Sequence, residues 1–271
     1  MANKKEIPFQ GKTLRYTILG QGAPVVLVHG FAEDSDVWKY QRDILSAHYR
    51  LIIPDLPGAG ASELTDQFSM ELGADYIRQV LQQENIEQTI LIGHSMGGYI
   101  ALAFAEKYAG QLQAFGLFHS TAYADNDEKK TSRQRGIAFV EAHGSHEFLQ
   151  QSIPNLFSPE SRISMSGAIK GMIEQYRDFN PNTLVACQQA MMQRPDRTHV
   201  LTSFNKPVLF IIGKYDTAVP YEQALRQSHL PHISYIHLLE HSGHMGMWEE
   251  TEKANTALLS FLADAGSTVT Q

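Results

Sequence analysis

Short, almost wholly apolar segments recur along this chain, and helix-forming segments separate them. Residues 25–29 read VVLVH, residues 89–92 read TILI and residues 207–212 read PVLFII. A strand that is apolar along its whole length is covered on both faces, which in globular proteins indicates a parallel sheet between two layers of helices. The alternation therefore predicts an α/β fold with a mostly parallel sheet.

The segments predict eight strands, of which the first two form a hairpin across Gly11-Lys12. The expected strands are residues 6–10, 13–19, 25–29, 51–54, 89–92, 114–118, 207–212 and 233–238. The expected helices that cover them are residues 36–47, 70–83, 97–108, 221–228 and 247–263. The small, polar tail from Gly266 is expected to fray.

The alternation stops at Ser120 and resumes at Pro207, and only helix signals lie between them. The expected N-caps of these helices are Asp125, Ser145, Ser158, Asn180 and Asp196. Proline follows Ser158 and Asn180 directly, as is common in the first turn of a helix. We therefore expect residues 122–204 to form a helical cap, inserted into a core made of residues 1–121 and 205–271.

The hexapeptide Gly93-His94-Ser95-Met96-Gly97-Gly98 stands where an expected strand ends and a helix begins. A serine between two glycines at such a junction is typical of a nucleophile elbow. The small neighbours permit a sharp turn that strains the serine backbone and exposes its Oγ. The next N–H, that of Met96, then points to where an oxyanion would form. Ser95 is thus the predicted nucleophile.

A serine hydroxyl needs a general base, and a histidine on the loop after the last strand suits this role. His241 and His244 both lie there, and His244 is favoured because it directly precedes the final helix, while Gly243 gives the loop freedom. Asp216 follows the strand 207–212, at the sheet edge where catalytic groups collect, and would orient the imidazole. Phe31, after His29-Gly30, is the expected second oxyanion donor, its N–H facing that of Met96.

These motifs together resemble those of the α/β-hydrolase fold superfamily, in its small capped branch of carboxylesterase-like enzymes. The matching motifs are His29-Gly30-Phe31, residues 55–62 (DLPGAGAS), the elbow, Gly213-Lys214-Tyr215-Asp216 and Gly243-His244. The resemblance implies that Ser95 is the nucleophile, His244 the base and Asp216 the orienting acid, in the chain order expected of this fold. It also assigns the oxyanion hole to Phe31 and Met96. The family often has histidine at the position of Ala59, a departure in a structural loop.

The resemblance implies a serine hydrolase that cleaves esters of small to medium, largely apolar substrates through an acyl-enzyme. A C–C bond hydrolase or a cofactorless perhydrolase would use the same triad, although the C–C hydrolases tend to have asparagine where this chain has His94. A ligand sensor with slow turnover on the same fold is a further alternative. Ser95 argues against the haloalkane dehalogenases and epoxide hydrolases, which use an aspartate nucleophile.

The composition of the chain excludes several classes of binding partner. The net charge of −7 argues against nucleic acid as a partner, and no run of 18 apolar residues is present to span a membrane. The lone cysteine and the absence of an apolar leader predict a cytoplasmic protein. The 12 histidines show no metal-ligand spacing with a third ligand, so no metal or cofactor is expected. A small-molecule ester is the expected partner, and the oligomeric state is left open.

The inserted segment leaves two interpretations open. Its methionines and phenylalanines, among them Met172, Met191, Phe139 and Phe157, either line an apolar cavity above Ser95 or attach the insertion to the core. An apolar cavity would favour uncharged acyl groups. Two further features are interpreted as structural: residues 129–135, with their lysines and arginines, as a solvated helix face, and Cys187 as a small packed hydrophobe.

Overall fold

A single sheet runs through the molecule, which the computed structural model describes from residue 2 to residue 267. Within that range the strand order is β1-β2-β4-β3-β5-β6-β7-β8. The strands are β1 Asn3–Phe9, β2 Lys12–Leu19, β3 Pro24–Val28, β4 Arg50–Pro54, β5 Thr89–His94, β6 Leu112–Phe118, β7 Val208–Gly213 and β8 Ser234–Leu239. β1 and β2 pair antiparallel, as do β2 and β4, and every other neighbouring pair is parallel. The predicted eight-stranded, mostly parallel sheet is thus confirmed.

Helices cover both faces of this sheet, because its strands are apolar on both sides. On one face lie α2 Met70–Gln83, α3 Met96–Tyr108 and α10 Tyr221–Gln227. On the other face lie α1 Lys39–Ser46, α11 Gly246–Glu249 and α12 Thr251–Ser267. Short 3₁₀ turns η1 Ser35–Trp38 and η2 Ala109–Gln111 join elements of this core. The tail predicted to fray lies mostly outside the described residues, although Gly266 itself still belongs to α12.

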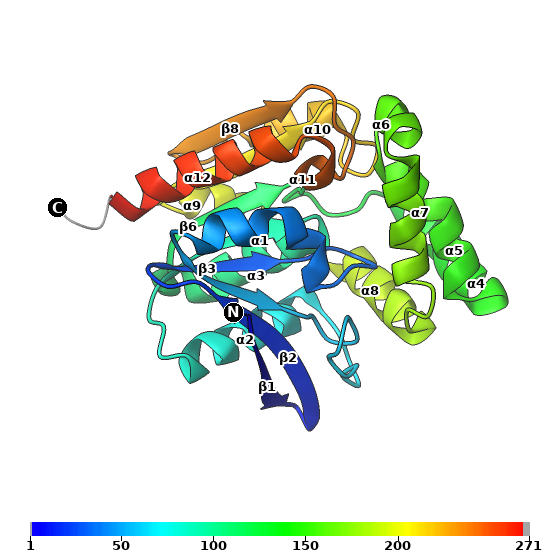
Figure 1. Cartoon of the computed structure of the whole chain (residues 1–271), viewed down its shortest axis with the longest axis horizontal. Helices are drawn as coiled ribbons and strands as arrows, with labels where there is room; N and C mark the ends of the chain where they lie inside the picture. Colours follow the sequence, from blue (N-terminus) through cyan, green and yellow to red (C-terminus); the bar gives the residue numbers. More distant parts are fainter. Residues whose placement is uncertain (1, 268–271) are drawn as a thin grey trace.

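Only helices lie between β6 and β7 in the described chain, and we call α4 to α9 the inserted helices. They are α4 Asp127–His143, α5 Ser145–Ser152, α6 Pro159–Ser164, α7 Ser166–Gln175, α8 Pro181–Gln193 and α9 Thr198–Ser203, with the 3₁₀ turn η3 Ile153–Leu156. Figure 1 shows α4 to α8 stacked beyond the arrowheads of β3 and β6, and α9 back against the core. The inserted helices therefore stand over the carboxyl ends of the parallel strands.

Three of the predicted N-caps of the inserted helices are wrong. The N-cap of α9 is Arg197 rather than Asp196, although Oδ1 of Asp196 accepts the N–H of Thr198 at 2.9 Å. Asn126, rather than Asp125, caps α4, and its Oδ1 accepts the N–H of Lys129 at 2.9 Å. The Asp125 carboxylate is buried instead, where it forms ion pairs with Arg133 and Arg194. Ser145 is already the first residue of α5 and makes no capping bond. Ser158 and Asn180 cap α6 and α8 as predicted.

The closing helix differs from the prediction because it breaks in two at Glu250. The backbone of Glu250 leaves the helical region (φ −126°, ψ 56°). Its Oε2 accepts the N–H of His241 at 2.9 Å and the hydroxyl of Ser242 at 2.8 Å. The break therefore fixes the loop that follows β8, which carries His244.

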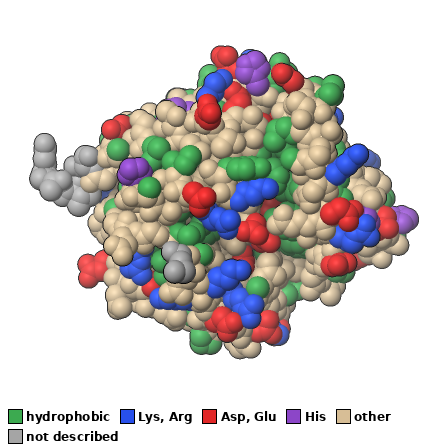
Figure 2. Space-filling model, viewed as in Figure 1, with side chains coloured by type: hydrophobic (Ala, Val, Ile, Leu, Met, Phe, Trp, Pro, Cys, Tyr) green, Lys and Arg blue, Asp and Glu red, His purple; other side chains and the backbone are tan. Residues whose placement is uncertain are grey.

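No helix within residues 2–267 is long and apolar enough to cross a membrane. Figure 2 shows basic and acidic side chains interspersed over one face of the molecule, with hydrophobic side chains between them.

A close approach between two elements lies at Gly97, where the start of α3 meets the end of β3. A Cβ at Gly97 would collide with the backbone oxygens of Val28 and His29, the second at 2.7 Å. Neither oxygen belongs to a side chain that can rotate away. The replacement Gly97→Ala should therefore lower the free energy of unfolding by about 1–3 kcal/mol or more.

Urea unfolding measures this change. Gly110→Ala is the matched control, because a Cβ there meets nothing within 4 Å. Equal stability of the two variants would contradict the prediction.

Candidate active site

Ser95 occupies the sharp turn between β5 and α3. Its backbone is in the left-handed region (φ 50°, ψ −115°), which costs a non-glycine residue conformational energy. Neighbouring backbone holds it there, since the N–H of Ser95 donates to the oxygen of Phe118 at 2.9 Å. The carbonyl of Ser95 accepts the hydroxyl of Ser120 at 2.7 Å. The turn is thus fixed by β6, and Ser95 lies at the wall of a cavity.

His244 and Asp216 form a buried pair beside this turn. The Nδ1 atom of His244 lies 2.7 Å from Oδ2 of Asp216. Oδ1 of Asp216 accepts the N–H groups of Ala218 and Val219, both at 2.8 Å. Burial alone would raise the pKa of Asp216, yet His244 and His119 hold it well below its usual value. Asp216 is therefore an anion that orients His244, leaving Nε2 of His244 for the cavity.

His241, the alternative base, lies elsewhere. Its side chain is 64% exposed, and its Nδ1 is 3.9 Å from Oε2 of Glu160. The structure therefore brings His244, and not His241, together with Asp216.

His119 is a member of this cluster that the sequence reasoning missed. It directly follows β6. Nδ1 of His119 lies 3.3 Å from Oδ2 of Asp216, and Nε2 accepts the N–H of Gly246 at 3.2 Å. The N–H of Gly213 also donates to Nδ1 at 3.2 Å, so backbone N–H groups meet both ring nitrogens and favour the neutral ring. Burial lowers the pKa of His119 to about 4, so the ring is neutral at physiological pH.

A second buried pair, Glu33 with His94, lies on the other side of His244. Nδ1 of His94 is 2.9 Å from Oε2 of Glu33, and Nε2 is 3.0 Å from the backbone oxygen of His244. Both partners accept hydrogen bonds, so His94 donates from both nitrogens and carries a positive charge. Burial disfavours each charge, but the partner's charge outweighs it and raises the pKa of His94 while lowering that of Glu33.

Glu33 also fixes the loop after β3. Its Oε2 accepts the N–H of Gly30 at 2.6 Å. The next residue, Phe31, lines the cavity, and Met96 follows Ser95 at the start of α3. Among residues 2–267, the hydrogen bonds assign no protein acceptor to the N–H of Phe31 or of Met96. No other protein group of the described chain thus engages either N–H; Phe31 itself lines the cavity, and Met96 is the residue next to Ser95.

The cavity above Ser95 has a volume of about 500 Å³ and a mixed lining. Met172 and Met191 of the inserted helices line it, whereas Phe139 and Phe157 do not. The lining also carries charged side chains, namely Asp125, Glu128, Lys129, Arg133 and Arg194. The expectation of an apolar cavity is therefore wrong in part, because α4 turns its basic side chains inward.

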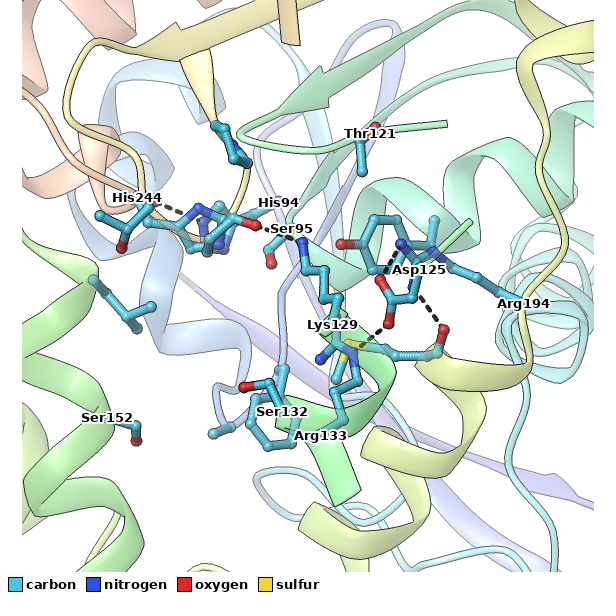
Figure 3. Close-up of a pocket in the computed structure, with 18 of the residues that line it drawn as sticks. His94, Ser95, Thr121, Asp125, Lys129, Ser132, Arg133, Ser152, Arg194 and His244 are labelled. Atoms are coloured by element: carbon cyan, nitrogen blue, oxygen red, sulfur yellow. Dashed lines mark hydrogen bonds and ion pairs between the residues drawn. The ribbon is translucent and has the colours of Figure 1, made fainter. Parts of the chain in front are cut away.

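The interpretation of residues 129–135 as a solvated helix face is wrong for Lys129 and Arg133, which line the cavity, whereas Arg135 is exposed. Oδ2 of Asp125 accepts Nε of Arg133 at 2.5 Å, and Oδ1 lies 2.8 Å from Nη2 of Arg194. Burial would raise the pKa of Asp125, but the two arginines lower it. Lys129 donates from Nζ to the backbone oxygen of Ala218 at 2.6 Å. Figure 3 shows Asp125 and Arg194 across the cavity from His94 and Ser95.

Two other features of the chain, its thiol and a cluster of possible metal ligands, add nothing to this chemistry. Cys187 is buried, and burial raises the pKa of its thiol to about 12, so it is no nucleophile at neutral pH. His119, Asp216 and His244 are the one set of possible metal ligands found close together among the described residues. Their nearest nitrogen and oxygen atoms are already engaged in hydrogen bonds with one another and with backbone N–H groups. The three side chains are thus held together by hydrogen bonds between Asp216 and the two imidazoles.

Comparison with known proteins places this chain in a family. A family model described as the alpha/beta hydrolase fold matches residues 23–251. A putative carbamate hydrolase from Acinetobacter baylyi is 28% identical over 90% of this chain and 94% of its own length. A 2-hydroxy-6-oxo-6-phenylhexa-2,4-dienoate hydrolase from Comamonas testosteroni is 26% identical over 92% of this chain and 91% of its own.

Solved structures give the same result. A thermophilic esterase from Thermogutta terrifontis superposes with a TM-score of 0.91 at 29% identity, over 97% of this chain and 99% of that one. An enol-lactonase from Burkholderia xenovorans superposes with a TM-score of 0.88 at 19% identity, over 96% and 100%, a likeness of fold alone.

Replacing His119 by Asn should make the fold less sensitive to acid. The folded ring stays neutral down to about pH 4, whereas in the unfolded chain it takes up a proton below about pH 6.5. The stability that depends on the neutral ring is complete above pH 6.5 and is lost as the pH falls towards 4. At pH 5 this loss is about 2 kcal/mol.

Urea unfolding of the wild type and of His119→Asn at pH 7 and pH 5 tests this. The free energy of unfolding of the wild type minus that of His119→Asn should be smaller at pH 5 than at pH 7 by about 2 kcal/mol. His241→Asn, in an exposed loop, is the control and should differ from the wild type equally at both pH values. A difference for His119→Asn that is the same at pH 7 and pH 5 would contradict the prediction.

Proposed function

The chain belongs to the alpha/beta hydrolase fold family, and on that premise we propose that it is a serine hydrolase that cleaves carboxylic esters of small to medium size. The observation that carries the proposal is the cluster of Ser95 with the buried pair of His244 and Asp216 at one cavity wall. In this proposal Ser95 is the nucleophile, His244 the general base and Asp216 the acid that orients it.

The proposed reaction has two steps. In the first, Oγ of Ser95 attacks the ester carbonyl while Nε2 of His244 takes its proton and passes it to the departing alcohol. The N–H groups of Phe31 and Met96 stabilise the oxyanion, and the acyl group stays on Ser95. In the second, His244 takes a proton from water, the resulting hydroxide attacks the acyl carbonyl, and the proton returns to Ser95 as the acid leaves.

We assign the two parts of the chain different tasks. Residues 1–121 and 205–271 would supply the core and the triad, and residues 122–204 would act as a cap that binds the substrate. Two features support this division: the inserted helices stand over the carboxyl ends of the strands, and they contribute Met172 and Met191 to the cavity.

The esterase from Thermogutta terrifontis supports cleavage of esters, since it is similar over nearly the whole chain. The alternative is a C–C bond hydrolase, and curated relatives named 2-hydroxy-6-oxononadienedioate hydrolases favour it at 26–28% identity. The basic side chains of the cavity also suit such dicarboxylate substrates. A perhydrolase or a sensor with slow turnover would require the same cluster.

Ser95→Ala should abolish the hydrolysis of p-nitrophenyl acetate and butyrate without unfolding the chain, because alanine fits the space of serine. His244→Ala should lower kcat by about a thousandfold or more, since His119, the other imidazole beside Asp216, does not line the cavity. His241→Ala is the control and should change kcat little, because its side chain is exposed.

The assay is the release of nitrophenolate, with circular dichroism to check the fold of each variant. Full activity in Ser95→Ala would refute the mechanism. Equal losses in the two histidine variants would show that the base is assigned wrongly. Turnover of a vinylogous diketone that exceeds turnover of any ester would favour the C–C bond hydrolase.

A further inference from the structure

Lys129 is a cation of the cavity with no carboxylate beside it. Its Nζ donates to the backbone oxygen of Ala218, and among residues 2–267 no acidic group lies within ion-pair distance of it. An ammonium group has three donors, so two remain for another acceptor. Figure 3 shows the amine reaching from α4 towards the side of the cavity where Ser95 lies.

The backbone contact locates this amine with respect to the proposed triad. Ala218, which accepts from Lys129, donates its own N–H to Asp216 at 2.8 Å. The amine therefore stands at the edge of the loop that holds the triad acid. Both Lys129 and Ser95 line the same cavity, so one bound molecule can contact both.

The side of the cavity that α4 forms carries a surplus of positive charge. Arg133 and Arg194 share the single carboxylate of Asp125, so these three side chains together are cationic. Glu128 is the remaining acid of this wall, and it is exposed at the first turn of α4. Glu33 is already neutralised by His94. Lys129 therefore adds to a charge that the cavity does not balance.

The positive charge of this wall affects the pKa of Tyr99. Its ring lies 3.9 Å from the guanidinium carbon of Arg194, and the residue lines the cavity. Burial acts to raise the pKa of Tyr99, but the charges of Arg194, Lys129 and Arg133 lower it overall. The positive potential is thus strong enough to outweigh burial at this point of the cavity.

We propose that Lys129, with Arg133 beside it, binds a carboxylate at the far end of the substrate's acyl chain, so that the favoured ester is a half-ester of a dicarboxylic acid. This inference rests on the proposed ester hydrolysis and names its substrate class. It replaces the expectation that uncharged acyl groups are preferred. Lys129 is then a residue that determines specificity, and Ser95 and His244 still carry out the chemistry.

The test compares half-esters with neutral partners of the same shape. Monomethyl succinate, glutarate and adipate are each measured against the corresponding methyl ester amide, in which a carboxamide stands for the carboxylate. For the chain length that fits, the wild-type kcat/KM should favour the acid by about tenfold or more, as a charged hydrogen bond does. Lys129→Gln keeps a donor for Ala218 and should lose this preference, because its kcat/KM falls further on the acids than on the amides.

Two further variants make the comparison specific. Lys129→Arg keeps the charge and should retain most of the preference. Lys130→Gln removes a charge from the neighbouring position of α4 that does not line the cavity, and it should retain the preference in full. Equal activity on acids and amides in the wild type would overturn the proposal, as would equal losses on both in Lys129→Gln.

Binding separates this proposal from the proposed function. Calorimetry with succinate, glutarate and adipate measures anion binding without any turnover. If no ester is hydrolysed but one diacid binds the wild type and not Lys129→Gln, the anion site stands and the ester hydrolase does not. If esters are hydrolysed through Ser95 but no diacid binds and no half-ester is preferred, the ester hydrolase stands and the anion site is overturned.

Discussion

The close approach of backbone around Ser95 is the constraint on which the rest of the site depends. Gly97 brings the start of α3 against the end of β3, and a side chain there would push the two apart. Because they touch, the loop after β3 lies beside Ser95, and a Cβ on Gly30 would come within 3.1 Å of that of Ser95. The strain of Ser95 is tolerated because β6 binds its backbone from the other side.

Two histidines then fix the loop of His244 from opposite directions. His94 is charged, paired with Glu33, and donates to the backbone oxygen of His244. His119 is neutral and links Asp216 to Gly246, two residues beyond His244. Their environments push their pKa values apart, upward for His94 and downward for His119, although the two rings are only 6.2 Å apart. The neighbouring acid decides the outcome, because Glu33 is a close partner of His94, whereas Asp216 is shared between His119 and His244.

The inserted helices bring both apolar and charged groups to the same cavity. Met172 and Met191 offer flexible apolar surface, while α4 adds Lys129 and Arg133. A buried arginine is stable only when its charge is paired, and Asp125 serves that purpose for two arginines at once. The pairing holds α4 to the chain that follows α8, and it leaves the cavity with a net positive wall.

The sequence by itself determined the sheet, its order of strands and helices and the motifs of the site, because these depend on local periodicity and on short turns that only small residues allow. The sequence already favoured His244 over His241, and the tertiary structure brings His244 to 2.7 Å from Asp216 while His241 stays exposed. The tertiary structure also revealed Glu33 and His119, whose partners lie 61 and 97 residues away. The sequence also could not show that Lys129 and Arg133 line the cavity. The elements on which a polar helix packs decide which of its faces is buried, and the residues of the helix itself do not.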